Sequence, residues 1–178
     1  MGKRACVYEL LKIKKVNVAM LQETHSDTLN GTDWRREWDG EVVLSGLSST
    51  SAGVAVLFAK DFIPKSHTVE ERVKGRLLVV RANFELFNLV FINVYAPNSG
   101  PARVQFLNEL SAVLSECEPE EFLFLGGDFN CTQNDELDRN HREPHAASKR
   151  AMTQLVATHI RHMERASHTS QTVHMGPL

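Results

Sequence analysis

The sequence predicts a layered α/β fold with mixed β-sheets, and three observations support this class. Apolar stripes with helical spacing alternate along the chain with short runs of β-branched and aromatic residues. Two pairs of these runs are joined by connections too short for a parallel crossover, which predicts antiparallel neighbours. The 178 residues, 42% apolar and 24% charged, suit one globular domain with a sizeable core.

The first half of the chain contains one predicted helix, one predicted strand and one hairpin. A helix over residues 4–15 is followed by a strand over 16–21, which ends in the polar motif Q-E-T. The polar stretch 26–40 has two tryptophans four residues apart, which favours a loop with a short helix. Residues 41–44 and 53–58 flank a loop rich in Ser, Gly and Thr and form a hairpin with a long connection.

The second half contains the strongest strand pair. Residues 76–84 and 86–95 are mostly β-branched or aromatic and almost adjacent, so they pair antiparallel. A helical stripe follows over 104–114. The apolar run 122–125, which ends at two glycines, predicts a buried core strand, and a final helix is expected near 148–163.

Three predicted strands end in polar or ionisable side chains. These are Glu23 after the first strand, Tyr95 at the end of the hairpin, and Asp128 with Asn130 after the run 122–125. Ligand sites in layered α/β folds lie outside the carboxyl ends of such strands. The double glycine at 126–127 lets the backbone turn sharply and approach a ligand closely. If these strand ends lie together, they form a site.

The side chains at these ends suit phosphodiester hydrolysis. A lone carboxylate such as Glu23 suits magnesium, which prefers oxygen ligands and keeps several waters. Asp128 could orient or deprotonate a water, and Asn130 could hold that water or the phosphate. Tyr95 could donate to a phosphoryl oxygen. The competing interpretation is structural: an Asx-rich turn, a solvated glutamate and a half-buried tyrosine that only packs.

Charge and cysteine content bear on the partner, the metal site and the cellular compartment of the protein. The net charge is −2, yet residues 139–178 carry six Lys and Arg against two acidic residues. This basic tail either meets phosphates or forms a solvated helix face. The three cysteines form no C-x-x-C pair, which favours a reducing compartment and argues against a structural zinc site. No membrane span is expected, so the predicted location is intracellular, either nuclear or cytoplasmic.

Three motifs in order carry a family resemblance. V-A-M-L-Q-E-T at 18–24, N-V-Y-A-P at 93–97 and G-G-D-F-N at 126–130 resemble the endonuclease/exonuclease/phosphatase superfamily. Within it the chain looks most like the apurinic-type endonuclease domain of LINE-type (non-LTR) retrotransposons. D-R-N-H at 138–141 adds to the likeness, which covers residues 4–160.

The resemblance implies a four-layer α/β sandwich with two mixed β-sheets and a site at one edge. It implies that Glu23 ligates the metal and that Tyr95 contacts the scissile phosphate. It implies that Asp128 orients the water, with Asn130 as its partner amide. The implied cofactor is Mg2+, with Mn2+ as the alternative, and the implied partner is DNA, which the enzyme nicks.

The chain also departs from this family pattern. Family members begin with a strand bearing an Asn and end with S-R-I-D-like and S-D-H segments, and none of these is present. The expectation is an incomplete domain over 1–165, lacking first and last strands, and a divergent tail over 166–178. One alternative is an inactive remnant that binds nucleic acid weakly. Another is a phosphoesterase of this fold acting on a phosphoinositide, a sphingolipid or RNA.

Overall fold

The structure is a computed structural model, and the residues it describes are 2–27, 31–119, 121–131 and 145–160. The chain divides into two compact units. The first unit consists of Met1–Tyr95 and Glu121–Asp128, and the second consists of Ala96–Glu120 and Phe129–Leu178. The first unit holds all the described strands and two helices, and the second holds the other described helices.

A three-stranded antiparallel sheet forms one half of the first unit. Its strands are β1 (Val18–Gln22), β3 (Val54–Phe58) and β2 (Glu41–Ser45), in that order across the sheet. All five residues of β3 are buried because the strand is central and covered on both faces. This double burial explains why its sequence, V-A-V-L-F, is continuously apolar and does not alternate.

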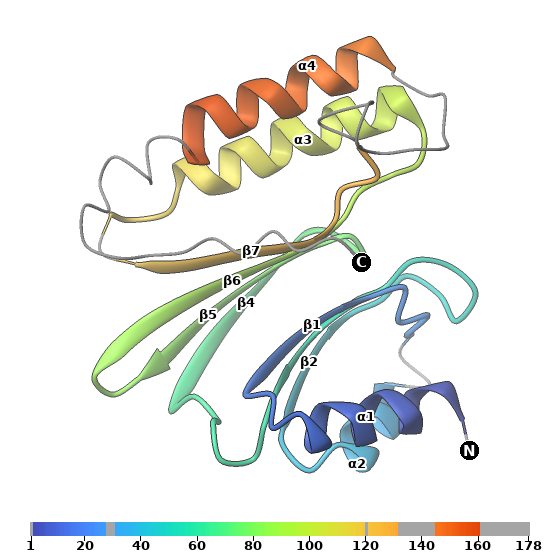
Figure 1. Ribbon diagram of the computed structural model, residues 1–178, viewed down its shortest axis with the longest axis vertical. Coiled ribbons are helices and arrows are strands. Elements are labelled where there is room, and N and C mark those ends of the chain that lie inside the picture. Colours follow the sequence, from blue (N-terminus) through green and yellow to red (C-terminus); the bar gives the residue numbers. More distant parts are fainter. Residues whose placement is uncertain (1, 28–30, 120, 132–144, 161–178) are drawn as a thin grey trace. The chain divides into compact units, whose positions relative to one another are not determined.

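Helices α1 (Lys3–Ile13) and α2 (Gly31–Glu37) cover one face of this sheet (Figure 1). Their aromatic side chains Tyr8 and Trp34 are buried against Ala55 and Leu57 of β3. The two rings meet edge to face, with centroids 5.9 Å apart, a geometry that aromatic pairs prefer. Of the apolar stripe that predicted the first helix, only Leu11 packs against this cluster, whereas Val7 and Leu10 are exposed.

The second sheet of this unit has four strands. Its order is β4 (Ser66–Val73), β5 (Leu77–Phe84), β6 (Phe87–Tyr95) and β7 (Phe122–Asp128). The first two neighbouring pairs are antiparallel and the third is parallel, so the sheet is mixed. The sequence interpretation missed β4, because most side chains of this edge strand are exposed and its residues show no apolar alternation.

The two sheets face each other across a shared core. Val54, Val56 and Phe58 of β3 pack against Leu78 and Val80 of β5, all of them buried. The predicted α/β class with two sheets is therefore confirmed, and both predicted strand pairs are antiparallel as expected. This packing fixes where the strands of one sheet end relative to those of the other.

Strand β7 differs from its prediction in two ways. It was expected to be a buried core strand, but it lies at the sheet edge, and Phe122 and Phe124 are 44% and 48% exposed. It also continues through both glycines to Asp128 and does not turn at them. A Cβ on Gly127 would lie 2.0 Å from the carbonyl oxygen of Val94, so this glycine permits close pairing with β6.

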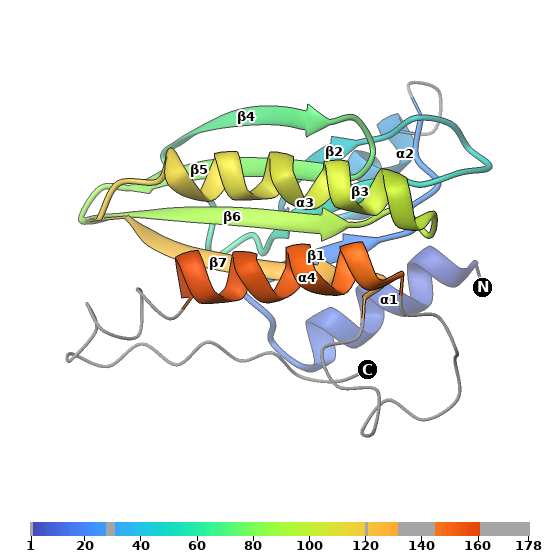
Figure 2. The same cartoon turned by 90° about the horizontal axis from the view of Figure 1, so that it is seen from above.

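The second unit contains two helices that run side by side (Figure 2). They are α3 (Gly100–Ser115) and α4 (Ala146–Leu155), and α4 passes into a π-helical turn η1 (Val156–Ile160). Both helices were predicted, and Leu110 and Leu155 lie on their buried faces. No helix in the described part of the chain is both long and apolar enough to cross a membrane.

Candidate active site

The ends of β1 and β6 meet through a direct hydrogen bond. Glu23 follows the last residue of β1, and Tyr95 is the last residue of β6. The Tyr95 hydroxyl donates to Oε1 of Glu23 at 2.7 Å. Glu23 is exposed and Tyr95 is partly buried, so a carboxylate and a phenol face solvent side by side. The strands belong to different sheets, and the bond therefore depends on the packing between them.

Glu23 adopts a strained backbone conformation. Its φ is +52°, in the left-handed region that residues other than glycine, asparagine and aspartate rarely visit. The chain just after it is tied to the Gly53 region, because the amides of Thr24 and His25 donate to the carbonyls of Gly53 and Ala52 at 3.1 and 2.9 Å. Such strain costs about 1–3 kcal/mol and clusters at functional sites.

Asp128 places a second carboxylate at the same edge. It is the last residue of β7, it is exposed, and it pairs in register with Tyr95 of the parallel neighbour β6. The pKa of Tyr95 is raised, first by its hydrogen bond to Glu23, then by partial burial and by the negative charges of Glu23 and Asp128. The Tyr95 hydroxyl therefore keeps its proton at neutral pH and acts as a donor.

A buried pair of amides lies directly behind these exposed groups. Gln22 Nε2 donates to Asn93 Oδ1 at 2.7 Å, which links β1 to β6. Asn93, fully buried, donates through Nδ2 to the carbonyl oxygens of Leu21 and Ala55 at 3.0 and 2.8 Å. Sequence reasoning did not assign Asn93 a role. A polar side chain inside an apolar strand was the available signal, since buried amides need partners.

Arg76 is a second group that sequence reasoning missed. It lies just before β5, opposite Tyr95, and its guanidinium carbon is 5.0 Å from the centroid of the Tyr95 ring. The Tyr95 amide donates to the Arg76 carbonyl at 2.7 Å, and Arg76 Nη1 donates to the Tyr95 carbonyl at 3.3 Å. Its positive charge lowers the pKa of Tyr95, against the larger raising effects.

Asn130 is placed within the second unit. Its φ is +46°, and its Nδ2 donates to the carbonyl oxygen of Ala96 at 2.7 Å. This bond ties the G-D-F-N segment to the residue that follows Tyr95 in the chain. The structure thus brings Glu23, Tyr95 and Asp128 together in the first unit, and it describes Asn130 by its contact with Ala96.

The carboxylates of Glu23 and Asp128 are the groups at this edge that could ligate a metal. Among the described residues, no group of three or more His, Cys, Asp or Glu side chains is arranged to hold a metal ion. Magnesium does not require such a group, because it is often held by one or two carboxylates with waters and substrate phosphates completing its shell. An exposed carboxylate at a strand end fits that chemistry.

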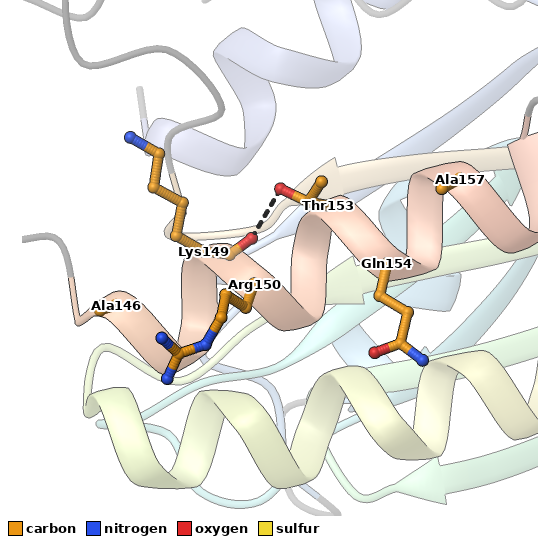
Figure 3. A pocket seen from close by; sticks show the side chains of 6 residues that line it. All are labelled: Ala146, Lys149, Arg150, Thr153, Gln154 and Ala157. Atoms are coloured by element: carbon orange, nitrogen blue, oxygen red, sulfur yellow. Dashed lines mark hydrogen bonds between the residues drawn. The ribbon is translucent and has the colours of Figure 1, made fainter.

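The basic tail is described only in part, along α4. An open depression of about 550 Å³ there is lined by residues of one helical surface, including Lys149 and Arg150. These two side chains point away from one another (Figure 3), so they do not converge on one anion. The other tail cations and the D-R-N-H motif lie outside the described residues: Arg139, Arg142, Arg161, Arg165 and 138–141.

Comparisons with known proteins show the family to which the chain belongs. Residues 2–168 match the model of the Endonuclease/Exonuclease/phosphatase family. The chain is 37% identical over 153 residues to the transposon TX1 uncharacterized 149 kDa protein of Xenopus laevis, covering 85% of this chain and 12% of that protein. The predicted resemblance to this family and to a retrotransposon protein is therefore confirmed.

Two solved structures illustrate the shared fold. An AP endonuclease from Archaeoglobus fulgidus superposes with a TM-score of 0.66 at 20% identity, covering 87% of this chain and 65% of that one. A humanized TDP2 from D. rerio gives a TM-score of 0.57 at 14% identity, covering 72% and 56%. The chain thus spans under two thirds of each of these structures and about an eighth of the Xenopus relative.

Proposed function

Because this chain belongs to the endonuclease/exonuclease/phosphatase family, we propose that it hydrolyses phosphodiester bonds of DNA with the help of a bound magnesium ion. The observation that carries the proposal is the 2.7 Å hydrogen bond from the Tyr95 hydroxyl to Glu23 Oε1, with Asp128 in register beside Tyr95. Two carboxylates and a phenol thereby converge from the ends of three strands. The transposon origin of the Xenopus relative supports DNA as the substrate.

Each residue has a role that follows from its chemistry. Asp128, an exposed carboxylate, accepts a proton from the attacking water as the new phosphorus–oxygen bond forms. Tyr95 keeps its single proton, which bonds Glu23 in the free protein; on substrate binding it turns to a phosphoryl oxygen and stabilises the charge that grows there. Asn130 orients the water or the phosphate through its side-chain amide. The phosphorus–oxygen bond to the leaving nucleotide breaks as the water attacks.

Glu23 is the proposed magnesium ligand, and its second carboxylate oxygen is not needed for the bond to Tyr95. When bound there, magnesium would supply positive charge opposite the phosphoryl and leaving oxygens. The strained backbone at Glu23 fits this role, because a fold keeps an unfavourable conformation where the position of the side chain matters more than local stability.

A plasmid-nicking assay in magnesium tests the proposal. Wild type is expected to convert supercoiled plasmid to nicked circles, and Asp128→Ala is expected to be slower by about 10²- to 10⁴-fold. Asp61→Ala is the matched control, since Asp61 is an exposed aspartate outside the site, and it should nick like wild type. Equal nicking by wild type and Asp128→Ala, or none by either, would refute the proposal.

The same preparation can be offered other substrates. Wild type with magnesium is incubated separately with supercoiled DNA, single-stranded RNA and a short-chain phosphoinositide. Faster turnover of RNA or phosphoinositide than of DNA would keep the reaction type and replace the proposed substrate. Chelation with EDTA is expected to stop turnover, and turnover that persists in EDTA would contradict the proposed metal role.

A further inference from the structure

Arg76 lies at the candidate site but takes no part in the roles given above. It is the last residue of the turn between β4 and β5, where its amide donates to the carbonyl of Val73 at 2.9 Å. Pairing of β5 with β6 sets it opposite Tyr95, with its guanidinium over the ring. Arginine stacks on aromatic faces and keeps its in-plane N–H donors for anions.

The charge of Arg76 is not neutralised within the part of the chain that the structure describes. No carboxylate there forms an ion pair with Arg76, and the single side-chain bond it makes is to the Tyr95 carbonyl. Arg81, five residues further along the same chain segment, is different: it forms ion pairs with Glu70 and with Glu121. The charge of Arg81 is thus paired with carboxylates of the fold. The charge of Arg76 and most of its five N–H donors remain available to a ligand.

The ionisable groups at the candidate site beside Arg76 are mainly acidic. Glu23 and Asp128 place two exposed carboxylates at the edge where a phosphate must bind. Both carboxylates repel an approaching polyanion, and a protein cation at this edge reduces that repulsion in addition to the proposed magnesium ion. Arg76 is partly buried against Tyr95, so its guanidinium is held in one place and loses little freedom when it meets an anion.

The position of Arg76 on the tyrosine ring selects which phosphate it meets. Tyr95 bonds Glu23 through its hydroxyl tip, whereas Arg76 lies over the ring face. The hydroxyl is the part of Tyr95 assigned to the cleaved phosphate, so an anion at the guanidinium is offset from it. A nucleic-acid strand offers such a second anion at each neighbouring nucleotide.

We propose that Arg76 binds the phosphate next to the cleaved one and that the substrate is therefore a nucleic-acid strand with at least two phosphates. This assignment depends on the proposed phosphodiester hydrolysis and adds to it a substrate-binding residue that recognises the polyanionic backbone. A substrate with one phosphodiester, such as bis(p-nitrophenyl) phosphate, has no group for Arg76 to bind.

Binding of a fluorescent DNA duplex in EDTA, followed by anisotropy between about 50 and 200 mM KCl, measures this contact without cleavage. Removing one phosphate contact is expected to flatten the slope of log K against log salt by about 0.9. Arg76→Ala should show that change and bind about tenfold more weakly. Arg76→Gln, which keeps a donor for the Tyr95 carbonyl, should behave alike, and Arg76→Lys should restore the slope.

Arg81→Ala is the matched control and should keep the wild-type slope, because its charge is committed to carboxylates. Relative to wild type, Arg76→Gln should lose more activity on DNA than on bis(p-nitrophenyl) phosphate in magnesium, whereas Arg81→Ala should lose none on either substrate. Wild-type nicking that Asp128→Ala abolishes, with an unchanged slope in both Arg76→Ala and Arg76→Gln, overturns the Arg76 assignment and leaves the proposed function standing. Absence of both DNA binding and nicking in wild type overturns both.

Discussion

The buried amide pair and the exposed groups at the strand ends differ sharply although they are neighbours along the chain. Gln22 and Asn93 are tied together behind the site, and Asn93 is fully buried with three hydrogen bonds. Glu23 and Tyr95, one and two residues further on, are solvent-accessible and joined by a single side-chain bond. The first pair links the two sheets, and the second presents groups that can react.

Neighbouring residues therefore serve different purposes. The inner pair, Gln22 and Asn93, stabilises the packing of the two sheets, and the outer pair, Glu23 and Tyr95, takes part in the proposed reaction. A buried amide that loses its hydrogen-bond partner is destabilising, so substitutions in the inner pair are expected to lower the free energy of unfolding more than those in the outer pair. An exposed pair contributes little to stability because water competes for its hydrogen bonds. The strained φ of Glu23 points the same way, since the fold tolerates a local cost at the outer pair. Substitutions in the inner pair should therefore lower stability, and substitutions in the outer pair should lower nicking activity with little change in stability.

The largest effect is expected from Glu23→Asn. Asparagine adopts positive φ more readily than glutamate but is too short to preserve the carboxylate, so the fold should persist while the proposed metal ligand is lost. Plasmid nicking should fall by about 10²-fold or more. The urea-derived free energy of unfolding should stay within about 1 kcal/mol of wild type or rise.

Glu85→Asn is the matched control for this variant. Glu85 is also an exposed glutamate with positive φ. It lies in the turn between β5 and β6, at the opposite end of β6 from Tyr95. It should change neither nicking nor, by more than about 1 kcal/mol, the free energy of unfolding. A large loss of stability in Glu23→Asn but not in Glu85→Asn would show that the outer pair carries the fold as well.

Asn93→Leu should give the reverse signature. The substitution keeps a similar volume but removes the hydrogen bonds to Gln22, Leu21 and Ala55. The free energy of unfolding should fall on the order of 3 kcal/mol, measured by urea titration. Asn88→Leu on the same strand is the control: its side chain is exposed, and its loss should cost about 0.5 kcal/mol or less. Similar costs for the two variants would contradict the comparison.

A smaller effect is expected from Tyr95→Phe, which removes only the hydroxyl. The ring, and with it the contact to Arg76, remains. Nicking should fall about tenfold, since one donor to the developing charge is lost, while stability should change by less than about 1 kcal/mol. Single-turnover nicking and urea unfolding of the same samples check both. Wild-type nicking by Tyr95→Phe would remove the hydroxyl from the mechanism.

The smallest effect concerns Tyr8, a buried tyrosine that takes no part in the site. Burial raises its pKa to about 12 from the ordinary 10. The folded state therefore holds the phenol proton more tightly than the unfolded state. Its stabilising contribution is complete below pH 10 and is lost as the pH rises from 10 through about 12.

Tyr8→Phe should therefore flatten the alkaline loss of stability. At neutral pH the variant loses the bond from the Tyr8 hydroxyl to the Trp34 carbonyl, which costs about 1 kcal/mol. Between pH 10 and about 12 the gap to wild type should shrink, as measured by urea unfolding at a series of pH values. A gap that stays constant across that range would show that Tyr8 does not titrate with unfolding.

Local pattern was enough for the helices, most strands and the three motifs at strand ends. Helical stripes and β-branched runs report burial through neighbours in the chain, which is why α1, α3, α4 and the β5–β6 pair lie close to their predicted ranges. The nearly adjacent runs of β5 and β6 also contained the signal for Arg76. A two-residue connection at 85–86 pairs Phe84 with Phe87 and so places Arg76 opposite Tyr95.

Position within a sheet depends on contacts distant in sequence, and this is where local pattern failed. The run 122–125 is as apolar as a core strand, yet β7 lies at an edge because sheet order decides burial. Strand β4 was missed because backbone pairing to β5 forms it without an apolar face. Of the two glycines before Asp128, Gly127 serves the close approach to β6, and neither makes a turn.

The sequence by itself determined that this chain is an α/β protein of its family, with chemistry-bearing residues at the ends of three strands. Only the tertiary structure decided that Glu23 bonds Tyr95, that Asn93 joins the sheets behind them, and that Arg76 lies on the tyrosine ring. The reason is physical: strand identity follows from local side-chain pattern, whereas contacts between strand ends depend on how two separate sheets pack.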